Sequence, residues 1–315
     1  NNYNSYYYGT DSVRQGIGQA GTTAGTNFFT TYGALAAYTI TLHVAATNDN
    51  ASGWSINAVP FLTDNDLHIP ATAAEINAGT AVVSVTNDYD MDPRPASSPD
   101  IGADEIVGYQ GGSLPAGTYY NVSIGVGALG GDVTVTNKLY LQGDVNAGGF
   151  TMTLGCNASV VGAGPSSFIG NGSVRKDYCT PGAFSYPVGT GVDYSPVDAN
   201  VTSVGTVPSS LAVTAHDAFL VGFDPLESIS RNWQLEEIGD LTADLLFYYV
   251  DSDVNGNEAD YRVWRREGNG TTTNMCAGGP CVDTGLNTLG PINGVTTFSR
   301  WTGSKPVGPT ASEAS

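Results

Sequence analysis

The sequence predicts an all-β protein in which a short β-solenoid is followed by an Ig-like β-sandwich. Apolar and polar residues alternate in short runs such as TITLHVA, DVTVT and DLLFYYV, as they do in strands with one buried face. Helical periodicity is nearly absent, because its two short candidates, TTYGALAAY and ATAAEINAG, are broken by glycine. The abundance of Gly, Thr, Ser, Asn, Val and Tyr suits many short strands joined by tight turns.

The middle of the chain, residues 108–183, is the predicted solenoid module. Corners such as NAGG and GAG interrupt its short strands, and short strands with regular glycine or asparagine corners are typical of coils that stack on one another. A series of sandwich strands is the alternative. The residues expected to face inward at every second position are Val133, Val135, Leu139, Leu141, Phe150, Met152, Leu154, Val160 and Phe168.

The later part of the chain, residues 184–304, is the predicted sandwich. Its strands are longer, and it contains Trp233, Trp264 and Trp301, which we expect in a buried aromatic core. Residues 305–315 are rich in Pro and Ser and lack a core pattern, so they are predicted to be a linker.

The charge limits the partners of the protein. The 315 residues include 30 acidic and 11 basic side chains, which give a formal net charge of −19. Such a surface repels nucleic acids and anionic lipids, so we expect neither as a partner. No apolar run is long enough for direct insertion into a membrane. Asn1 begins strand-like sequence without a charged and apolar leader, so we expect further sequence upstream.

The four cysteines are predicted to form two disulfides. Cys276 and Cys281 enclose the glycines of MCAGGPC, which favours a small disulfide loop over a zinc site, since no further ligands lie nearby. Cys156 and Cys179 are separated by about one solenoid coil, so they are expected on neighbouring coils. Disulfides indicate an oxidising compartment, and we therefore expect an extracellular or cell-surface protein.

An acidic loop in the first third of the chain is one candidate calcium site. Asp88, Asp90 and Asp92 supply alternating carboxylates, the hard oxygen ligands that suit Ca²⁺, and Asp100, Asp104 and Glu105 follow them. The alternative is a polar plug in which Arg94 pairs with aspartates and the other carboxylates cap backbone amides.

The segment DSDVNGNEAD is the second candidate calcium site. Asp251, Asp253, Asn255 and Gly256 match the opening of an EF-hand loop, but Arg262 stands where the bidentate glutamate belongs. The flanking segments are predicted strands, so a turn between two sandwich strands is the alternative. Apart from calcium, no cofactor is expected.

Three stretches resemble modules of large bacterial surface proteins. The stretch from NNYNSYYYG to DIGADEI resembles the closing coils of a right-handed parallel β-helix with the ending of choice-of-anchor proteins, and it covers residues 1–107. LPAGTYYNVSIGVGALGGDVTVTNKLYLQGDVNAGG is similar to a solenoid-like module of outer-surface and type-nine-secreted proteins. The stretch from ISRNWQLEE to GVTTFSRWTG resembles the β-sandwich that usually follows that module.

The resemblance implies a non-catalytic structural or adhesive module of a surface protein or fibre. The residues agree with this, because His43, His68 and His216 are scattered and no nucleophile elbow, zinc motif or phosphate-binding loop is present. The expected partners are further copies of the chain, joined end to end, or surface glycans. The alternative is a carbohydrate-binding or polysaccharide-degrading β-helix protein whose active site lies upstream of Asn1.

Overall fold

The chain forms two compact units, Asn1–Gly108 and Tyr109–Ser315. The computed structural model describes residues 112–276 and 281–306, the backbone of five short strands before residue 110, and Asp88, Arg94 and Asp100. Nearly all regular structure in the described residues is strand, so the predicted all-β class is confirmed.

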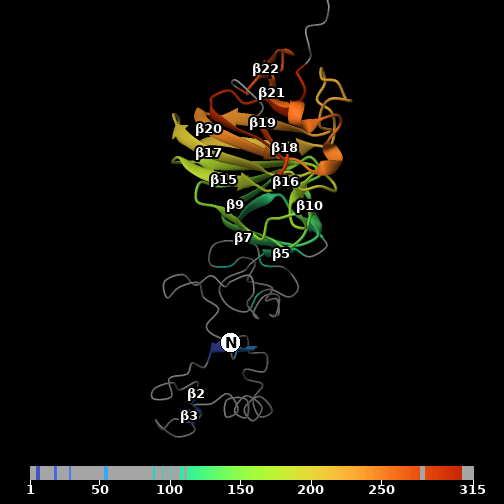
Figure 1. Ribbon diagram of the computed structural model, residues 1–315. Helices are drawn as coiled ribbons and strands as arrows, with labels where there is room; N and C mark the ends of the chain where they lie inside the picture. The colour runs from blue at the N-terminus through green and yellow to red at the C-terminus, as the bar shows by residue number, and fades with distance from the viewer. Residues whose placement is uncertain are drawn as a thin grey trace, which may run out of the picture. The chain divides into compact units, whose positions relative to one another are not determined.

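The strands, many of which are labelled in Figure 1, are β1 (Ser5–Tyr7), β2 (Gly18–Gln19), β3 (Phe28–Phe29), β4 (Gly53–Ser55), β5 (Val107–Tyr109), β6 (Ser113–Leu114), β7 (Gly117–Ile124), β8 (Gly127–Leu129), β9 (Val133–Leu141), β10 (Val145–Asn146), β11 (Thr151–Leu154), β12 (Ser159–Val161), β13 (Ile169–Gly170), β14 (Ser173–Tyr178), β15 (Gly182–Tyr186), β16 (Val188–Gly189), β17 (Val197–Val204), β18 (Ser209–His216), β19 (Asn232–Ile238), β20 (Leu241–Tyr248), β21 (Arg262–Arg266), β22 (Thr272–Asn274), β23 (Val282–Asp283), β24 (Thr288–Val295) and β25 (Arg300–Ser304). Two 3₁₀ turns, η1 (Asp251–Asp253) and η2 (Glu258–Asp260), lie between β20 and β21.

The first unit contains two strand pairs among its described residues. β1 and β4 are parallel, with Tyr6 opposite Trp54, and β2 and β3 are antiparallel. A parallel pair requires a long connection between its strands, as the predicted β-helix end would supply. Apart from Asp88, Arg94, Asp100 and Val107, the other residues of that predicted segment, 1–107, lie outside the described part of the chain.

Residues 113–189 form a β-solenoid of about four turns, which confirms the predicted solenoid. Each turn contributes a short strand to a parallel sheet in the order β6-β8-β10-β13-β16 and a longer strand to a second sheet in the order β7-β9-β11-β14. Equivalent residues stack from coil to coil. Val133, Met152 and Val174, for example, are neighbours in register and all are fully buried.

The predicted inward pattern of the solenoid is confirmed at seven of the nine positions, which are buried: Val133, Val135, Leu139, Leu141, Met152, Leu154 and Phe168. Phe150 is 39% exposed and Val160 is half-buried, so those two predictions were wrong. Phe150 directly follows Gly148 and Gly149, whose positive φ values form a corner, and its side chain therefore leaves the alternation of the strands.

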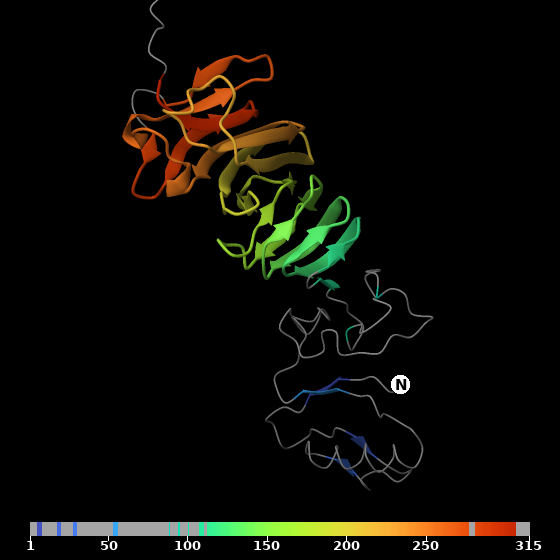
Figure 2. The same cartoon turned by 90° about the vertical axis from the view of Figure 1, so that its right-hand side faces the viewer.

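The large sheet continues from the solenoid into the sandwich without a break. β14 pairs in parallel with β11 on one side and antiparallel with β18 on the other. Beyond β18 the strands are antiparallel, in the order β18-β19-β25-β21-β22. Figure 2 shows the green solenoid strands following one another towards the orange strands of the sandwich.

The second sandwich sheet is antiparallel, in the order β15-β17-β20-β24-β23. Trp233 and Trp301 of the large sheet enclose Phe247 of the second sheet, with ring centroids 5.2 and 5.3 Å from it, and all three residues are fully buried. The predicted aromatic core is therefore present, although Trp264 lies outside it and packs against Phe223, with the two rings tilted at 55°. The expected division between solenoid and sandwich, at residues 183–184, falls within β15.

Both predicted disulfides are confirmed, and no cysteine is free. Cys156–Cys179 joins the turn after β11 to the end of β14, so it links two neighbouring coils as expected. Cys276–Cys281 closes a short loop between β22 and β23.

Candidate functional site

A row of polar side chains crosses the outer face of the large sheet. Side chains alternate between the two faces of a strand. Trp233, Leu235 and Trp301 are buried in the core, so Gln234 and Arg300 point outward. In register, Arg266 of β21 lies opposite Arg300 of β25, Arg300 opposite Gln234 of β19, and Gln234 opposite Thr214 of β18. We call Arg266, Arg300, Gln234 and Thr214 the polar row.

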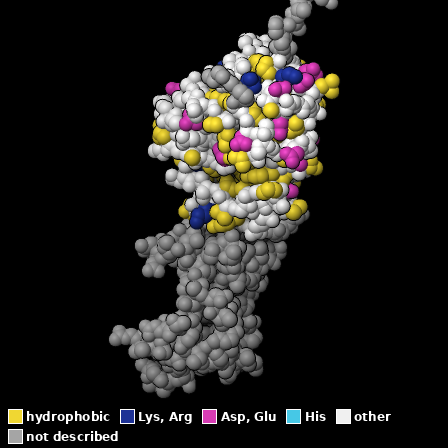
Figure 3. All heavy atoms as spheres, in the orientation of Figure 1, with side chains coloured by type: hydrophobic (Ala, Val, Ile, Leu, Met, Phe, Trp, Pro, Cys, Tyr) yellow, Lys and Arg dark blue, Asp and Glu magenta, His cyan; other side chains and the backbone are white. Residues whose placement is uncertain are grey.

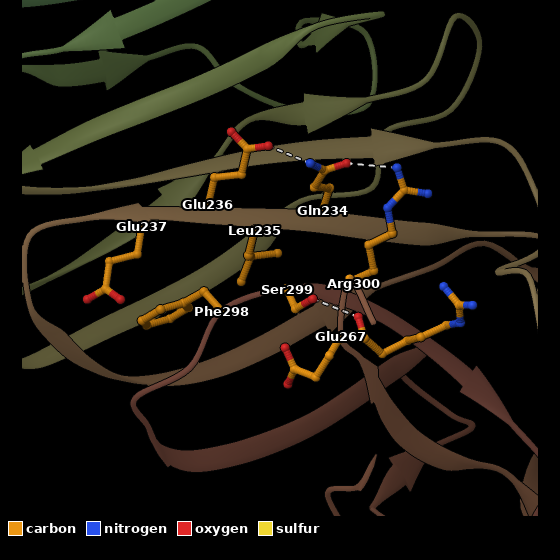
Figure 4. Close-up of a pocket in the computed structure, with 10 residues that line it drawn as sticks. Gln234, Leu235, Glu236, Glu237, Glu267, Phe298, Ser299 and Arg300 are labelled. Carbon is orange, nitrogen blue, oxygen red and sulfur yellow. Dashed lines mark hydrogen bonds between the residues drawn. The ribbon is translucent and has the colours of Figure 1, made fainter. Parts of the chain in front are cut away.

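The first hollow, of about 660 Å³, lies at one end of the polar row. Arg300 Nη2 donates to Gln234 Oε1 over 3.0 Å, and Gln234 Nε2 in turn donates to Glu236. Figure 4 shows these three side chains in sequence along the sheet. This hydrogen-bonded chain holds donor and acceptor groups in fixed positions at the rim of the hollow.

The rest of the first hollow combines an aromatic ring with carboxylates. Phe298, Glu237 and Glu267 line it beneath the polar row in the view of Figure 4. Burial raises the pKa of the Glu237 carboxyl above its ordinary value, against a hydrogen bond from the Leu241 amide that lowers it. Glu267 Oε1 lies 2.7 Å from Arg265 Nε, so this carboxylate is already paired with a cation.

The second hollow, of about 640 Å³, lies at the other end of the row, where the large sheet meets the solenoid corners. Its lining includes Ser173, Thr214, His216, Asn171 and Gly191. Asn171 Nδ2 donates to Asn146 Oδ1 of the preceding coil. Because Gly191 has no side chain, the Asn171 amide, 3.5 Å from where a Cβ would stand, is left open to the hollow.

His216 lines the second hollow together with the carboxylate of Asp217. Burial, together with the positive charge of Arg300, lowers the pKa of His216, so the imidazole is neutral at physiological pH. Its Nε2 is buried and has no hydrogen-bond partner within the described residues. A buried polar atom without a partner is uncommon in proteins and marks a position where a ligand or water can bind.

The segment DSDVNGNEAD does not form a converging set of oxygen ligands. Asp253 is only 2% exposed, and its two carboxylate oxygens accept hydrogen bonds from Nε and Nη2 of the buried Arg231, at 3.0 and 2.8 Å. Arg231 Nη2 also lies 3.0 Å from Asp193. The carboxylate that would occupy the centre of an EF-hand loop is therefore bound to a cationic side chain.

The neighbours of Asp253 in this segment have separate partners. Asp251 accepts from Asn287 Nδ2 over 2.6 Å, and Asn255 Nδ2 donates to the main-chain oxygen of Asp253. Gly256 has a φ of 89°, the left-handed conformation that glycine permits in a sharp turn. Within residues 112–276 and 281–306, no three His, Cys, Asp or Glu side chains are grouped to hold a metal ion.

The acidic loop of the first unit is described at three positions. Asp88 and Asp100 are 9% and 2% exposed, and Arg94 Nη1 donates to the main-chain oxygen of Asp100 over 3.1 Å. Buried aspartates beside an arginine are what the polar-plug alternative expects. Asp90 and Asp92 lie outside the described residues, so calcium binding by this loop stays a prediction.

Lys176 is a buried residue that the sequence analysis missed. It stands in the inward-facing column of β14, and its Nζ donates to the main-chain oxygens of Gly155 and Cys156. The ring centroids of Tyr178 and Phe184 lie 6.0 and 5.9 Å from Nζ. Burial lowers the pKa of Lys176 to about 8, although the charge of Asp177 opposes this.

The polar row was also missed, although the spacing of Trp264 and Arg266 by two residues already places both on one face of a strand. What the sequence does not contain is the register of β21, β25, β19 and β18, because their partners are far apart along the chain.

The visible face of the second unit in Figure 3 carries more acidic than basic side chains, as the composition requires. No helix in the described residues is long and apolar enough to cross a membrane.

Comparison with models of known families, with characterised proteins and with solved structures found no match to this chain. The β-solenoid is thus shown by the fold itself, while the relation to bacterial surface proteins depends on the resemblance of the stretches quoted above.

Proposed function

We propose that the chain is a non-catalytic structural module of an extracellular protein, in which solenoid and sandwich act as one mechanical unit. The observation that carries this proposal is the double pairing of β14. Five residue pairs, from Val174 with Val213 to Tyr178 with Ser209, extend the solenoid sheet directly into the sandwich. A backbone ladder of this kind transmits load from one part to the other without a linker.

Side-chain contacts reinforce the same junction. Arg231, just before β19, bonds to Asp193 in the loop after β16, and Trp233 Nε1 donates to the main-chain oxygen of Ser195 over 2.9 Å. The Cys156–Cys179 disulfide fixes β14 to the coil beneath it. Solenoid and sandwich are therefore held together by backbone pairing and side-chain bonds, and the disulfide anchors the shared strand β14 within the solenoid.

The extracellular part of the proposal is supported by the cysteines. All four are oxidised in the fold, and disulfides persist in oxidising compartments. Antibody labelling of intact cells of the source organism tests this location, with permeabilised cells as the control. Signal that appears only after permeabilisation contradicts it.

Single-molecule pulling of the full chain by its two ends tests the mechanical proposal. We expect residues 109–315 to open in one event, and the contour length gained, at about 3.3–3.6 Å per residue, identifies which residues were released. Chemical reduction of the disulfides is the internal control. It frees the residues that each disulfide encloses, so the contour length gained on unfolding increases, while the fold before pulling is expected to stay the same. Separate opening of the solenoid and the sandwich contradicts the proposal.

A further inference from the structure

We propose that the polar row and the two hollows form one binding groove for a neutral polysaccharide chain. This inference concerns a binding activity, and it does not depend on the structural role proposed above.

The two hollows are joined by the polar row. Arg266, Arg300 and Gln234 line the first hollow, and Thr214 lines the second. Gln234 and Thr214 are direct cross-strand partners, so no strand separates the hollows. With about 4.8 Å between neighbouring strands, the path from Arg266 on β21 to Ser173 on β14 is roughly 19 Å long. An extended ligand of several units fits this length better than a single small molecule.

The groove contains hydrogen-bond donors that the fold does not use. Arg266 and Arg300 lie directly opposite each other, an arrangement of like charges that destabilises a sheet. It stands out in a chain with only 11 basic residues. Within the described residues, no acceptor is hydrogen-bonded to the Arg266 guanidinium, and Arg300 donates only to Gln234. Ligand oxygens are the partners that such donors lack.

The mixture of groups selects the class of ligand. A hydroxyl both donates and accepts hydrogen bonds, whereas a carboxylate, sulfate or phosphate only accepts. The groove places Glu236 next to Arg300 through Gln234, and the chain has a net charge of −19, so an anionic ligand is repelled. The neighbouring hydroxyls of a neutral sugar can bond to both kinds of side chain.

The ends of the groove carry further groups suited to a sugar chain. Phe298 presents an aromatic ring in the first hollow, against which the apolar face of a pyranose can pack. In the second hollow, Asn171, Thr214 and Asp217 supply hydrogen-bonding side chains for sugar hydroxyls.

Isothermal titration of the full chain with hexasaccharides tests the proposal. The probes are cellohexaose, mannohexaose, xylohexaose and chitohexaose, with hexagalacturonate as the anionic counterpart, each up to about 10 mM, where a millimolar site is mostly filled. We expect at least one neutral probe to bind and hexagalacturonate not to bind. Arg266→Ala and Gln234→Ala should each weaken binding by about tenfold or more, because each removes hydrogen bonds to the ligand.

Arg262→Ala is the matched control, since Arg262 lies on the same strand and the same face but lines neither hollow. This variant should bind as the unchanged chain does. Thermal melts exclude unfolding as the cause, because removing Arg266 relieves a like-charge pair and should not lower the melting temperature. Failure of all four neutral probes, preference for hexagalacturonate, or binding that survives both groove variants would overturn the proposal.

Discussion

Arg231 and Asp253 form an ion pair that is closed off from solvent. The arginine side chain is fully buried, the aspartate is 2% exposed, and two hydrogen bonds of 2.8 and 3.0 Å join them. The pair ties the η1 turn to the start of β19, next to the tryptophan core. Without Arg231, Asp253 would be an uncompensated buried charge, whereas Arg231 without Asp253 would keep only the partly exposed Asp193.

Asp253→Ala is expected to lower the free energy of unfolding by about 3–5 kcal/mol, the usual cost of removing one partner from a buried pair. Urea denaturation followed by tryptophan fluorescence measures it, since Trp233 lies two residues from Arg231. Asp251→Ala is the matched control: this exposed neighbour bonds only to Asn287, and its loss should cost about 0.5 kcal/mol or less. Equal effects of the two variants would contradict the assignment.

Removal of calcium provides a second prediction. A structural ion that binds only the native state raises the melting temperature, so melts in CaCl₂ and in EDTA reveal such a site. Because Asp253 is occupied by Arg231, we expect Asp251→Ala and the unchanged chain to show the same difference between the two conditions. If Asp251→Ala abolishes a calcium-dependent rise, then this segment binds the ion after all.

The two disulfides should contribute unequally to stability. Cys156 and Cys179 are 23 residues apart, whereas Cys276 and Cys281 are 5 residues apart. Constraint of the unfolded chain predicts about 3 kcal/mol for the longer loop and about 2 kcal/mol for the shorter one. Paired Cys→Ser variants of each disulfide, compared in urea, measure the difference. A larger loss from the shorter loop would mean that native contacts, and not loop closure, dominate.

Lys176 gives the protein an unusual dependence of stability on pH. Its pKa in the fold is about 8, while a lysine in the unfolded chain retains its proton to about 10.5. The unfolded state therefore binds more protons above pH 8, and the free energy of unfolding rises with pH there. Tyr178 acts in the opposite direction above pH 10, since burial raises its pKa to about 12. The rise is thus expected between about pH 8 and pH 10.

Lys176→Met should remove this rise, and urea denaturation at several pH values measures it. Lys138→Met is the control, because Lys138 lies half-exposed on strand β9, two strands from β14, and should leave the pH dependence unchanged. If the free energy of unfolding of Lys176→Met still rises between pH 8 and pH 10, then another group causes the rise.

The parts of the fold that depend on local pattern were predictable from the sequence. Leu139 and Leu141 alternate at period two and are buried, and the glycines of MCAGGPC allow Cys276 and Cys281 to meet. These features need only neighbours along the chain. Phe150 was misplaced because the corner formed by Gly148 and Gly149 breaks the alternation just before it.

The junction and the groove could not be predicted in the same way. The pairing of Val174 with Val213 and of Arg266 with Arg300 depends on register between distant segments, which no local pattern encodes. For Asp253, the sequence contained a metal-ligand spacing but no sign that Arg231 would reach it through the core. The burial of Lys176 depends on the turn at Gly155 and Cys156 of the neighbouring coil, whose main-chain oxygens accept hydrogen bonds from its Nζ.

Strand β14 marks the boundary between a part of the molecule whose length can change, the solenoid, and a part that stays constant, the sandwich. Each solenoid coil contacts only the coils next to it, while the large sheet passes from the solenoid into the sandwich through the pairing of β14 with β18. A coil inserted or removed before β9 would alter the length of the solenoid in steps and leave the residues of the sandwich and of the groove in place. The length of the solenoid can therefore change independently of the sandwich.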